Sequence, residues 1–226
     1  QQFPGVSLLV AASADLRASD LVVWAVKPQT FKEAALTSQP FLANALHLSV
    51  AAGITSESMA GWLQTQRIVR AMPNTPALVG LGMTGLFARD GASAADRALV
   101  EAVVKTTGEL VWVSAEQQLD AVTALSGSGP AYVFYFLEAM RDAGTRMGLP
   151  PEVAYQLAVG TFIGASTLAQ RSDDPPQVLR ERVTSKGGTT YAALTSMEAA
   201  GVKAKFEEAL FAARQRAEEL GREFGK

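Results

Sequence analysis

The feature that most constrains the fold of this 226-residue chain is a change of pattern near Glu116. Before that residue, short apolar runs rich in β-branched side chains alternate with helix-like segments, and after it only helical patterns follow. Strands and helices at this spacing favour a parallel sheet covered by helices. We therefore expect an α/β, Rossmann-like parallel-sheet domain over residues 1–115 and an all-α domain over residues 116–226.

The individual elements can be placed from apolar periodicity and from helix start signals. Strands are expected at residues 6–10, 20–26, 46–52, 67–72, 83–88 and 109–114, and the helices between them at 30–37, 56–66 and 93–106. The second half is expected to form helices at 117–125, 130–147, 151–170, 175–184, 189–200 and 202–220. Three of these begin at a proline, the residue favoured in the first helical turn.

Composition excludes several classes of function. The net charge of −2 offers no basic surface for nucleic acid or an anionic membrane. The absence of cysteine removes thiol catalysis and disulfides, and no cluster has metal-ligand spacing. No apolar run reaches the roughly 18 residues of a membrane span, and the first residues lack the pattern of a signal peptide. We expect a cytoplasmic protein without a metal, a nucleic acid or a membrane partner.

Two conspicuous features are interpreted as structural. His47 is the only histidine, and no neighbouring residue in the sequence supplies a partner for catalysis, so we expect it in the core. The segment GLGMTG, residues 80–85, matches G-x-G-x-x-G, but a dinucleotide-binding loop follows a strand and opens a helix. Here a strand-like run comes next, and we interpret the segment as a turn into a strand.

The ends of three successive expected strands favour a nicotinamide cofactor. Ligands of open parallel sheets bind beyond the carboxyl ends of the strands. A chain in which no acid–base or nucleophile motif is recognisable is suited to hydride transfer, in which the cofactor carries the chemistry. The residues at these ends form the predicted cofactor site: Ala25, Val26, Lys27, Pro28, Ala51, Ala52, Gly53 and Asn74.

Two glycine-rich stretches stand at helix starts in the second half. They are SGSGPAY, residues 126–132, and SKGGTTYAAL, residues 185–194. Backbone N–H groups at a helix N-terminus form an anion site, and Gly187 and Gly188 let a ligand approach the backbone closely. Thr189 and Thr190 either cap the helix or face the ligand. Two such stretches in one helical domain favour a small carboxylic acid as substrate.

These segments in order resemble the pyrroline-5-carboxylate reductase family over nearly the whole chain. The match includes DLVVWAVKPQ, SVAAGI, RIVRAMPNTPALVGLGMTGL, EAMRDAGTRMGLP and SKGGTTYAAL, and VTALSGSGPAY is highly specific. The resemblance implies reduction of 1-pyrroline-5-carboxylate to L-proline with NADPH or NADH, the final step of proline biosynthesis. It also implies a homodimer interlocked through the helical domain, which can assemble further into a decamer.

The resemblance assigns roles by position. The predicted substrate site consists of Glu116, Ser126, Gly127, Ser128, Gly129, Gly187, Gly188, Thr189 and Thr190. The N–H groups of Thr189 and Thr190 would bind the carboxylate, and the Thr190 hydroxyl, the predicted catalytic group, would face the ring nitrogen. No metal is implied.

The chain departs from the family pattern in two places. The family opens with a strand and a G-x-G-x-M-A turn that binds the pyrophosphate, and the 226 residues contain no such segment. The preference between NADPH and NADH therefore stays open, and a chain truly lacking the turn should bind the dinucleotide poorly. The family usually reads S-P-G-G-T-T, whereas Lys186 replaces the proline here, either as a cation near the substrate or as a solvated loop residue.

Two other functions stay open at this point. A related two-domain hydroxy-acid dehydrogenase would use a lysine of the helical domain, for which Lys186 is a candidate. Alternatively, the chain is a helical dimerisation module without catalysis. Oxidation of hydroxy acids and titration with NADPH would discriminate between these.

Overall fold

The computed structural model describes residues 5–42 and 44–225. These residues form two compact units. The first contains the described residues up to Ser128 together with those from Ala212 onward, and the second is Gly129–Phe211. The units differ from the expected division at Glu116 because the segment after it and the end of the final helix both pack with the sheet.

The first unit is built on a five-stranded sheet in which spatial order follows chain order. The strands are β1 (Leu21–Trp24), β2 (Leu46–Ser49), β3 (Ile68–Met72), β4 (Gly82–Ala88) and β5 (Gly108–Trp112). Strands β1, β2 and β3 are parallel, β4 is antiparallel to β3, and β5 is parallel to β4.

The α/β class followed by helices is confirmed, but the expectation of a wholly parallel sheet is wrong at β4. Residues 73–81, which join β3 to β4, include only the short 3-10 helix η3 (Thr75–Val79). A parallel crossover needs a dozen or more residues. The chain therefore turns back directly beside β3 and runs in the opposite direction.

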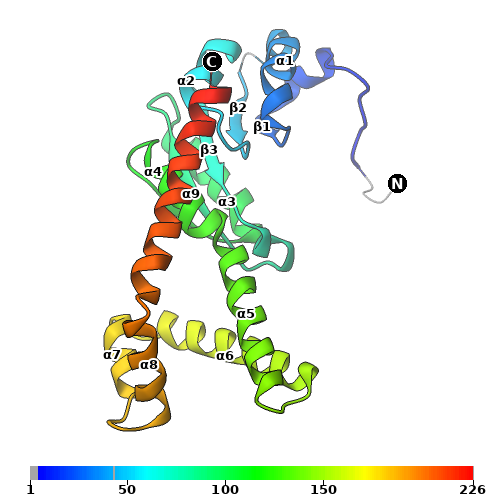
Figure 1. Cartoon of the computed structure of the whole chain (residues 1–226). Helices are drawn as coiled ribbons and strands as arrows, with labels where there is room; N and C mark the ends of the chain where they lie inside the picture. Colours follow the sequence, from blue (N-terminus) through cyan, green and yellow to red (C-terminus); the bar gives the residue numbers. More distant parts are fainter. Residues whose placement is uncertain (1–4, 43, 226) are drawn as a thin grey trace. The chain divides into compact units, whose positions relative to one another are not determined.

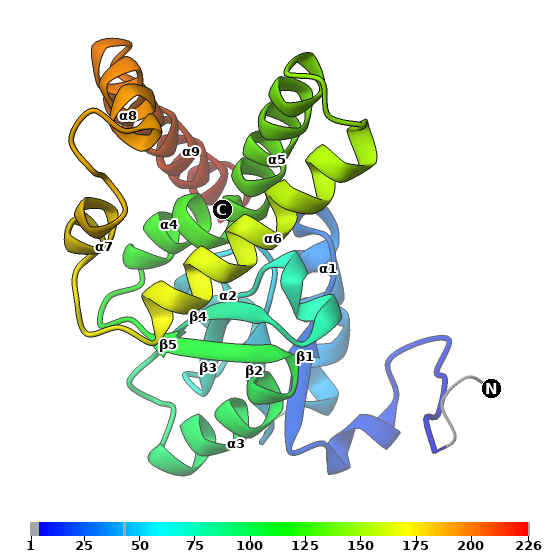
Figure 2. The same cartoon turned by 90° about the horizontal axis from the view of Figure 1, so that it is seen from below.

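Helices cover both faces of the sheet and bury two apolar clusters. Helices α1 (Pro28–Ser38) and α2 (Ser56–Leu63) contribute to a cluster that contains Trp24, Phe31 and Met59. Helix α3 (Ala94–Val104) contributes to a cluster on the opposite face. Figure 2 shows α3 below β5 in that view. Each cluster contains side chains from alternate positions of the strands, as a pleated sheet requires.

The strand expected at residues 6–10 is wrong. Val6–Val10 lie outside the sheet, with Leu8 84% exposed, and the first described element is the 3-10 helix η1 (Ala14–Ala18). Figure 1 shows this blue segment running away from β1 as an irregular trace. Apolar, β-branched composition favours a strand only where a sheet can pair with it.

The second unit consists of helices that match their expected positions closely. They are α5 (Gly129–Arg146), α6 (Pro151–Gln170), α7 (Pro176–Arg182), α8 (Thr189–Ala199) and the first part of α9 (Val202–Phe224). Helices α5 and α6 meet where Gly144 faces Ala154; a methyl group on Gly144 would lie 2.8 Å from the Ala154 side chain. Large apolar side chains such as Phe134 and Tyr135 stay exposed in the isolated chain.

Among the described residues, no helix is both long enough and apolar enough to cross a membrane.

His47 lies in the core, as expected. Its side chain is 1% exposed, and the Trp24 indole N–H donates to His47 Nδ1 at 3.0 Å. The Nε2 atom has no hydrogen-bond partner among the described residues. Burial, assisted by the charge of Arg67, lowers the pKa of His47 from 6.5 to about 4. The ring is therefore neutral at pH 7 and accepts the tryptophan hydrogen bond.

This environment predicts a loss of stability in mild acid. Between pH 6.5 and about 4 the unfolded chain binds a proton at His47 and the folded chain does not. The free energy of unfolding should therefore fall by about 3 kcal/mol across that interval. Urea denaturation of the wild type and of His47→Asn, which keeps an acceptor for Trp24, measures this. An equally steep decrease in both proteins would contradict it.

Candidate active site

The structure brings the predicted cofactor residues of β1 and β2 to one edge of the sheet. The two strands are parallel neighbours, so Ala25 and Ala51 follow strand ends that lie side by side. Lys27 is exposed at the N-cap position of α1, and Pro28 is its first residue. The proline has no N–H to leave unsatisfied, which suits it to this position.

The turn Ala51–Gly53, which joins β2 to α2, presents its three small residues differently. Ala51 is buried, and its N–H donates to Ser49 Oγ at 3.2 Å. Gly53 has a φ of 75°, a conformation that favours glycine. Ala52 alone is exposed. Of the three residues, Ala52 is therefore the one that a cofactor could contact closely, whereas Ala51 and Gly53 determine the backbone conformation of the turn.

Asn74, just after β3, connects three elements. Its side-chain N–H donates to the Ser126 carbonyl at 3.1 Å, and its Oδ1 accepts from the Met83 N–H at 2.9 Å. The end of β3, the third strand end of the predicted cofactor site, is thus hydrogen-bonded both to β4 and to the segment containing Ser126. Any contact of Asn74 with a cofactor would be made by an amide that these hydrogen bonds already orient.

The segment Ser126–Gly129 differs from the free helix start expected from its sequence. Helix α4 (Gln118–Val122) continues into a π-helical turn, η5 (Thr123–Gly127), which leads into α5. The Ser128 N–H donates to the Thr123 carbonyl at 2.8 Å, and Ser126 Oγ donates to the Val122 carbonyl. These groups are engaged within the helix. The expectation of an open N-terminus here is therefore wrong, although π turns are frequent at functional sites.

Gly127 in this turn faces the end of the Met72 side chain. A methyl group on Gly127 would lie 2.7 Å from the Met72 side-chain methyl. The π turn therefore sits directly on the end of β3.

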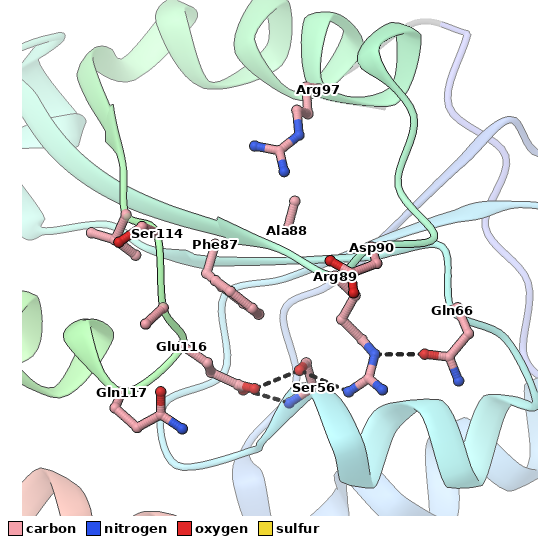
Figure 3. Close-up of a pocket in the computed structure, with 12 residues that line it drawn as sticks. Ser56, Gln66, Phe87, Ala88, Arg89, Asp90, Arg97, Ser114, Glu116 and Gln117 are labelled. Atoms are coloured by element: carbon pink, nitrogen blue, oxygen red, sulfur yellow. Dashed lines mark hydrogen bonds between the residues drawn. The ribbon is translucent and has the colours of Figure 1, made fainter.

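Glu116 lies where the β5–α4 connection meets the start of α2 (Figure 3). The Ser56 N–H donates to Glu116 Oε1 at 2.6 Å, and Ser56 Oγ donates to Oε2 at 2.5 Å. Arg70 of β3 donates to Oε1 at 2.7 Å. The carboxylate thus satisfies an N–H of the first turn of α2, where a negative charge also favours the helix dipole.

Arginines surround this carboxylate. Arg89, just after β4, donates to Ser56 Oγ at 3.1 Å and pairs with Glu57 at 2.8 Å. Ser56 is 1% exposed, and the side chains of Arg70 and Glu116 are 13% and 19% exposed. Burial opposes ionisation of Glu116, but the Ser56 hydrogen bonds and the Arg70 charge outweigh it and hold its pKa below the ordinary value.

Two cavities border Glu116. One, of about 480 Å³, is lined by Arg89, Arg97 and Ser114 among others and is shown in Figure 3. The other, of about 520 Å³, is lined by Gly53, Asp120 and Arg214 among others. Burial raises the pKa of Asp120, which Arg70 partly offsets. Glu116 therefore forms part of a structural ion-pair network, and its contact with a substrate stays a prediction.

Within the second unit, the SKGGTT segment forms the turn into α8. Gly187 has a φ of 75°, and Gly188 is the N-cap residue; its N–H donates to the Ser185 carbonyl at 3.0 Å. In the described structure no side chain caps this helix. Thr189 and Thr190 are its first two residues, so the capping interpretation of these threonines is wrong. Their N–H groups therefore belong to the first turn of a helix that no described side chain caps.

The interpretation of GLGMTG as a turn into a strand is confirmed. Gly80 ends η3 with a φ of 72°, and Gly82 begins β4. A methyl group on Gly85 would lie 2.6 Å from a Val122 methyl carbon, so α4 occupies this face. The third glycine therefore serves helix–sheet packing.

Sequence reasoning missed Ser56 and Arg70, which donate to Glu116, and Arg89, which donates to Ser56. They lie 60, 46 and 27 residues away from Glu116 in the chain, so no local spacing connects them. The one available signal was Arg70 in the middle of the expected apolar strand 67–72, because a buried guanidinium requires an acidic partner.

Comparison with known proteins agrees with this architecture. The model for pyrroline-5-carboxylate reductase dimerisation matches residues 116–220. A pyrroline-5-carboxylate reductase of Pseudomonas aeruginosa is 45% identical over 210 residues, covering 92% of this chain and 77% of the relative. One from Arabidopsis thaliana is 39% identical over 217 residues, covering 96% of this chain and 78% of the relative.

Solved structures give the same result. The pyrroline-5-carboxylate reductase of Coxiella burnetii has a TM-score of 0.85 at 40% identity, covering 90% of this chain and 76% of the other. The enzyme of Plasmodium falciparum, solved with NADP bound, has a TM-score of 0.86 at 29% identity, covering 97% of this chain and 86% of the other.

A mixed sheet flanked by helices, followed by a helical region that matches the dimerisation model, is the architecture of a two-domain oxidoreductase of the Rossmann type. Within that class, the chain belongs to the pyrroline-5-carboxylate reductase family.

The Glu116 network predicts a measurable contribution to stability. Glu116→Gln should lower the free energy of unfolding by about 2 kcal/mol at pH 7, because Arg70 loses its partner. Since the folded-state pKa of Glu116 is lowered from 4.5, this contribution is present above that value and is lost as the pH falls through the folded pKa. Urea denaturation of both proteins at neutral and acidic pH tests this. A difference that persists unchanged in acid would contradict it.

Proposed function

We propose that this chain reduces 1-pyrroline-5-carboxylate to L-proline, with the turn Gly187–Thr190 binding the substrate carboxylate. The reaction follows from family membership: the chain is an NAD(P)H-dependent oxidoreductase that acts on a cyclic imine in proline biosynthesis. The observation that carries the proposed role of the turn is the uncapped N-terminus of α8 behind a glycine at positive φ.

The turn has the chemistry that a small carboxylate needs. The first N–H groups of a helix lack intrahelical acceptors, and the dipole adds partial positive charge there. At Gly187 a methyl group would meet nothing within 4 Å in the described structure, so the backbone is open on that side. The substrate carboxylate is attached to the ring carbon next to the imine nitrogen, so a hydroxyl next to the carboxylate site, that of Thr190, can reach that nitrogen.

The cofactor site is proposed at the edge formed by Ala25–Pro28, Ala51–Gly53 and Asn74. This is the region where ligands of open parallel sheets bind, and the exposed Ala25, Lys27 and Ala52 are its accessible members. The Plasmodium falciparum relative was solved with NADP, which supports a nicotinamide dinucleotide here.

The chemistry divides between cofactor and protein. A bound reduced nicotinamide would supply a hydride, which would form the new C–H bond at the imine carbon, C5 of the proline product, while the C=N π electrons would move to nitrogen. The N–H groups of Thr189 and Thr190 hold the carboxylate. The Thr190 hydroxyl donates a hydrogen bond at the ring nitrogen, through which the proton is delivered from this hydroxyl or from water.

The chain forms a homo-oligomer, as the dimerisation family implies. We propose a dimer as the basic unit, which can assemble into a decamer, in the cytoplasm. The exposed apolar side chains of α5 and α6 support such an assembly, because patches of this kind mark interaction surfaces. The alternative of a hydroxy-acid dehydrogenase is tested by offering hydroxy acids with NAD(P)⁺ to the same preparation.

Thr190 provides the direct test. In the full-length enzyme, Thr190→Val should lower kcat for NADPH-dependent imine reduction by roughly a hundredfold, since a positioned proton donor contributes about that much. Thr195→Val, the same substitution at an exposed position of the same helix, is the matched control and should leave kcat unchanged. Loss of nicotinamide absorbance follows the reaction. Equal rates for both variants would reject the role of Thr190.

Lys186 is tested separately. It is exposed in the turn before α8, where a cation can attract the substrate anion. Lys186→Gln and Lys186→Pro should each raise KM for the imine acid severalfold at low salt, with little change in kcat. Lys203→Gln, which removes an exposed lysine of α9, controls for net charge. An unchanged KM in both Lys186 variants means that Lys186 is a solvated loop residue.

A further inference from the structure

The last turns of α9 pack on the connection between β2 and α2. Figure 1 shows the red end of α9 beside α2. A methyl group on Gly53 would lie 3.2 Å from the Leu220 carbonyl oxygen. One on Gly225 would lie 3.2 Å from the Thr55 methyl. Two glycines thus allow this helix end to approach the turn Ala51–Gly53 and the N-cap of α2 closely.

A chain of hydroxyl groups joins the same elements. Ser58 Oγ donates to the Gly225 carbonyl at 2.5 Å. Because that hydrogen is used, Thr55 Oγ1 donates its own hydrogen to Ser58 Oγ, at 2.7 Å, and accepts the Ser58 N–H at 3.1 Å. The hydroxyl that caps α2 is therefore oriented by the end of α9.

Apolar contact strengthens the attachment. Phe224 is partly buried and packs against the core cluster that includes Ile54 and Met59. Ile54 immediately follows the turn Ala51–Gly53. From the other side, Glu116 holds the N–H and hydroxyl of Ser56. The start of α2 is thus fixed between the β5–α4 connection and the end of α9, all within the first compact unit.

We infer that Leu220–Gly225 is a positioning element for the cofactor: it holds the turn Ala51–Gly53 in its binding conformation through Gly53, Thr55 and Ser58. This inference rests on the proposed cofactor edge. It extends the cofactor site to Phe224 and Gly225, which lie beyond the matched dimerisation region and act through the core cluster and the Ser58 hydrogen bond.

Phe224→Ala in the full-length enzyme is the main test. Hydrogen exchange of the amides of residues 51–58 should become at least tenfold faster, and the Kd for NADPH should rise about tenfold. The KM for 1-pyrroline-5-carboxylate, measured at saturating NADPH, should stay within twofold. Phe224→Leu should bring both the exchange rates and the Kd for NADPH most of the way back to the wild-type values. Ser58→Ala, which removes no core volume, should raise the exchange rates and the Kd in the same direction but by a smaller factor.

Glu223→Ala is the matched control. Its carboxylate pairs at 3.5 Å with Arg216 on the same helix, and its removal should change neither exchange nor Kd. Unchanged exchange at residues 51–58 in Phe224→Ala and Ser58→Ala would overturn the inference, as would faster exchange with an unchanged Kd. An equal rise in Kd and KM would indicate general destabilisation and would also overturn it. Failure of the proposed function is distinct: the wild type would then neither bind NADPH nor reduce the imine.

Discussion

The carboxylate of Glu116 holds together the parts of the molecule on which the candidate cofactor edge depends. It accepts hydrogen bonds from Ser56 at the start of α2 and from Arg70 in the middle of the sheet. Glu116 itself belongs to the connection between β5 and α4. A buried charge of this kind persists only when its partners are supplied in full. The geometry of α2, and of the turn before it, is therefore coupled to the connection that follows β5.

The small residues at the strand ends are required for different physical reasons, and the surroundings of each residue in the structure show which reason applies. Ala52 is exposed and free to face a ligand, whereas Gly53 accommodates the backbone of Leu220 and Gly127 accommodates Met72. In the second unit, Gly187 permits the turn that leaves the start of α8 uncapped. A glycine-rich motif can thus reflect packing, backbone conformation or ligand access, and each position has to be judged by what surrounds it.

Helices, most strands and the family could be predicted from the sequence, because proline starts, apolar runs and motifs such as SGSGPAY are local signals. Three features could not. The reversal of β4 depends on the length of a connection, the run 6–10 depends on pairing, and the π turn at Thr123–Gly127 depends on packing against Met72 and on the hydrogen bond from Asn74. The network around Glu116 joins residues far apart in the chain, so only the folded structure brings it into view.

The return of α9 to the first unit has a consequence for biosynthesis. The core beneath β1 and β2 receives Phe224, and the cap of α2 receives Gly225. During translation these residues emerge after the whole helical region, so the α/β unit stays unfinished on the ribosome until then. Domains that fold as units while the chain is being made leave the ribosome in order; here the first unit can be completed only after the second has been synthesised.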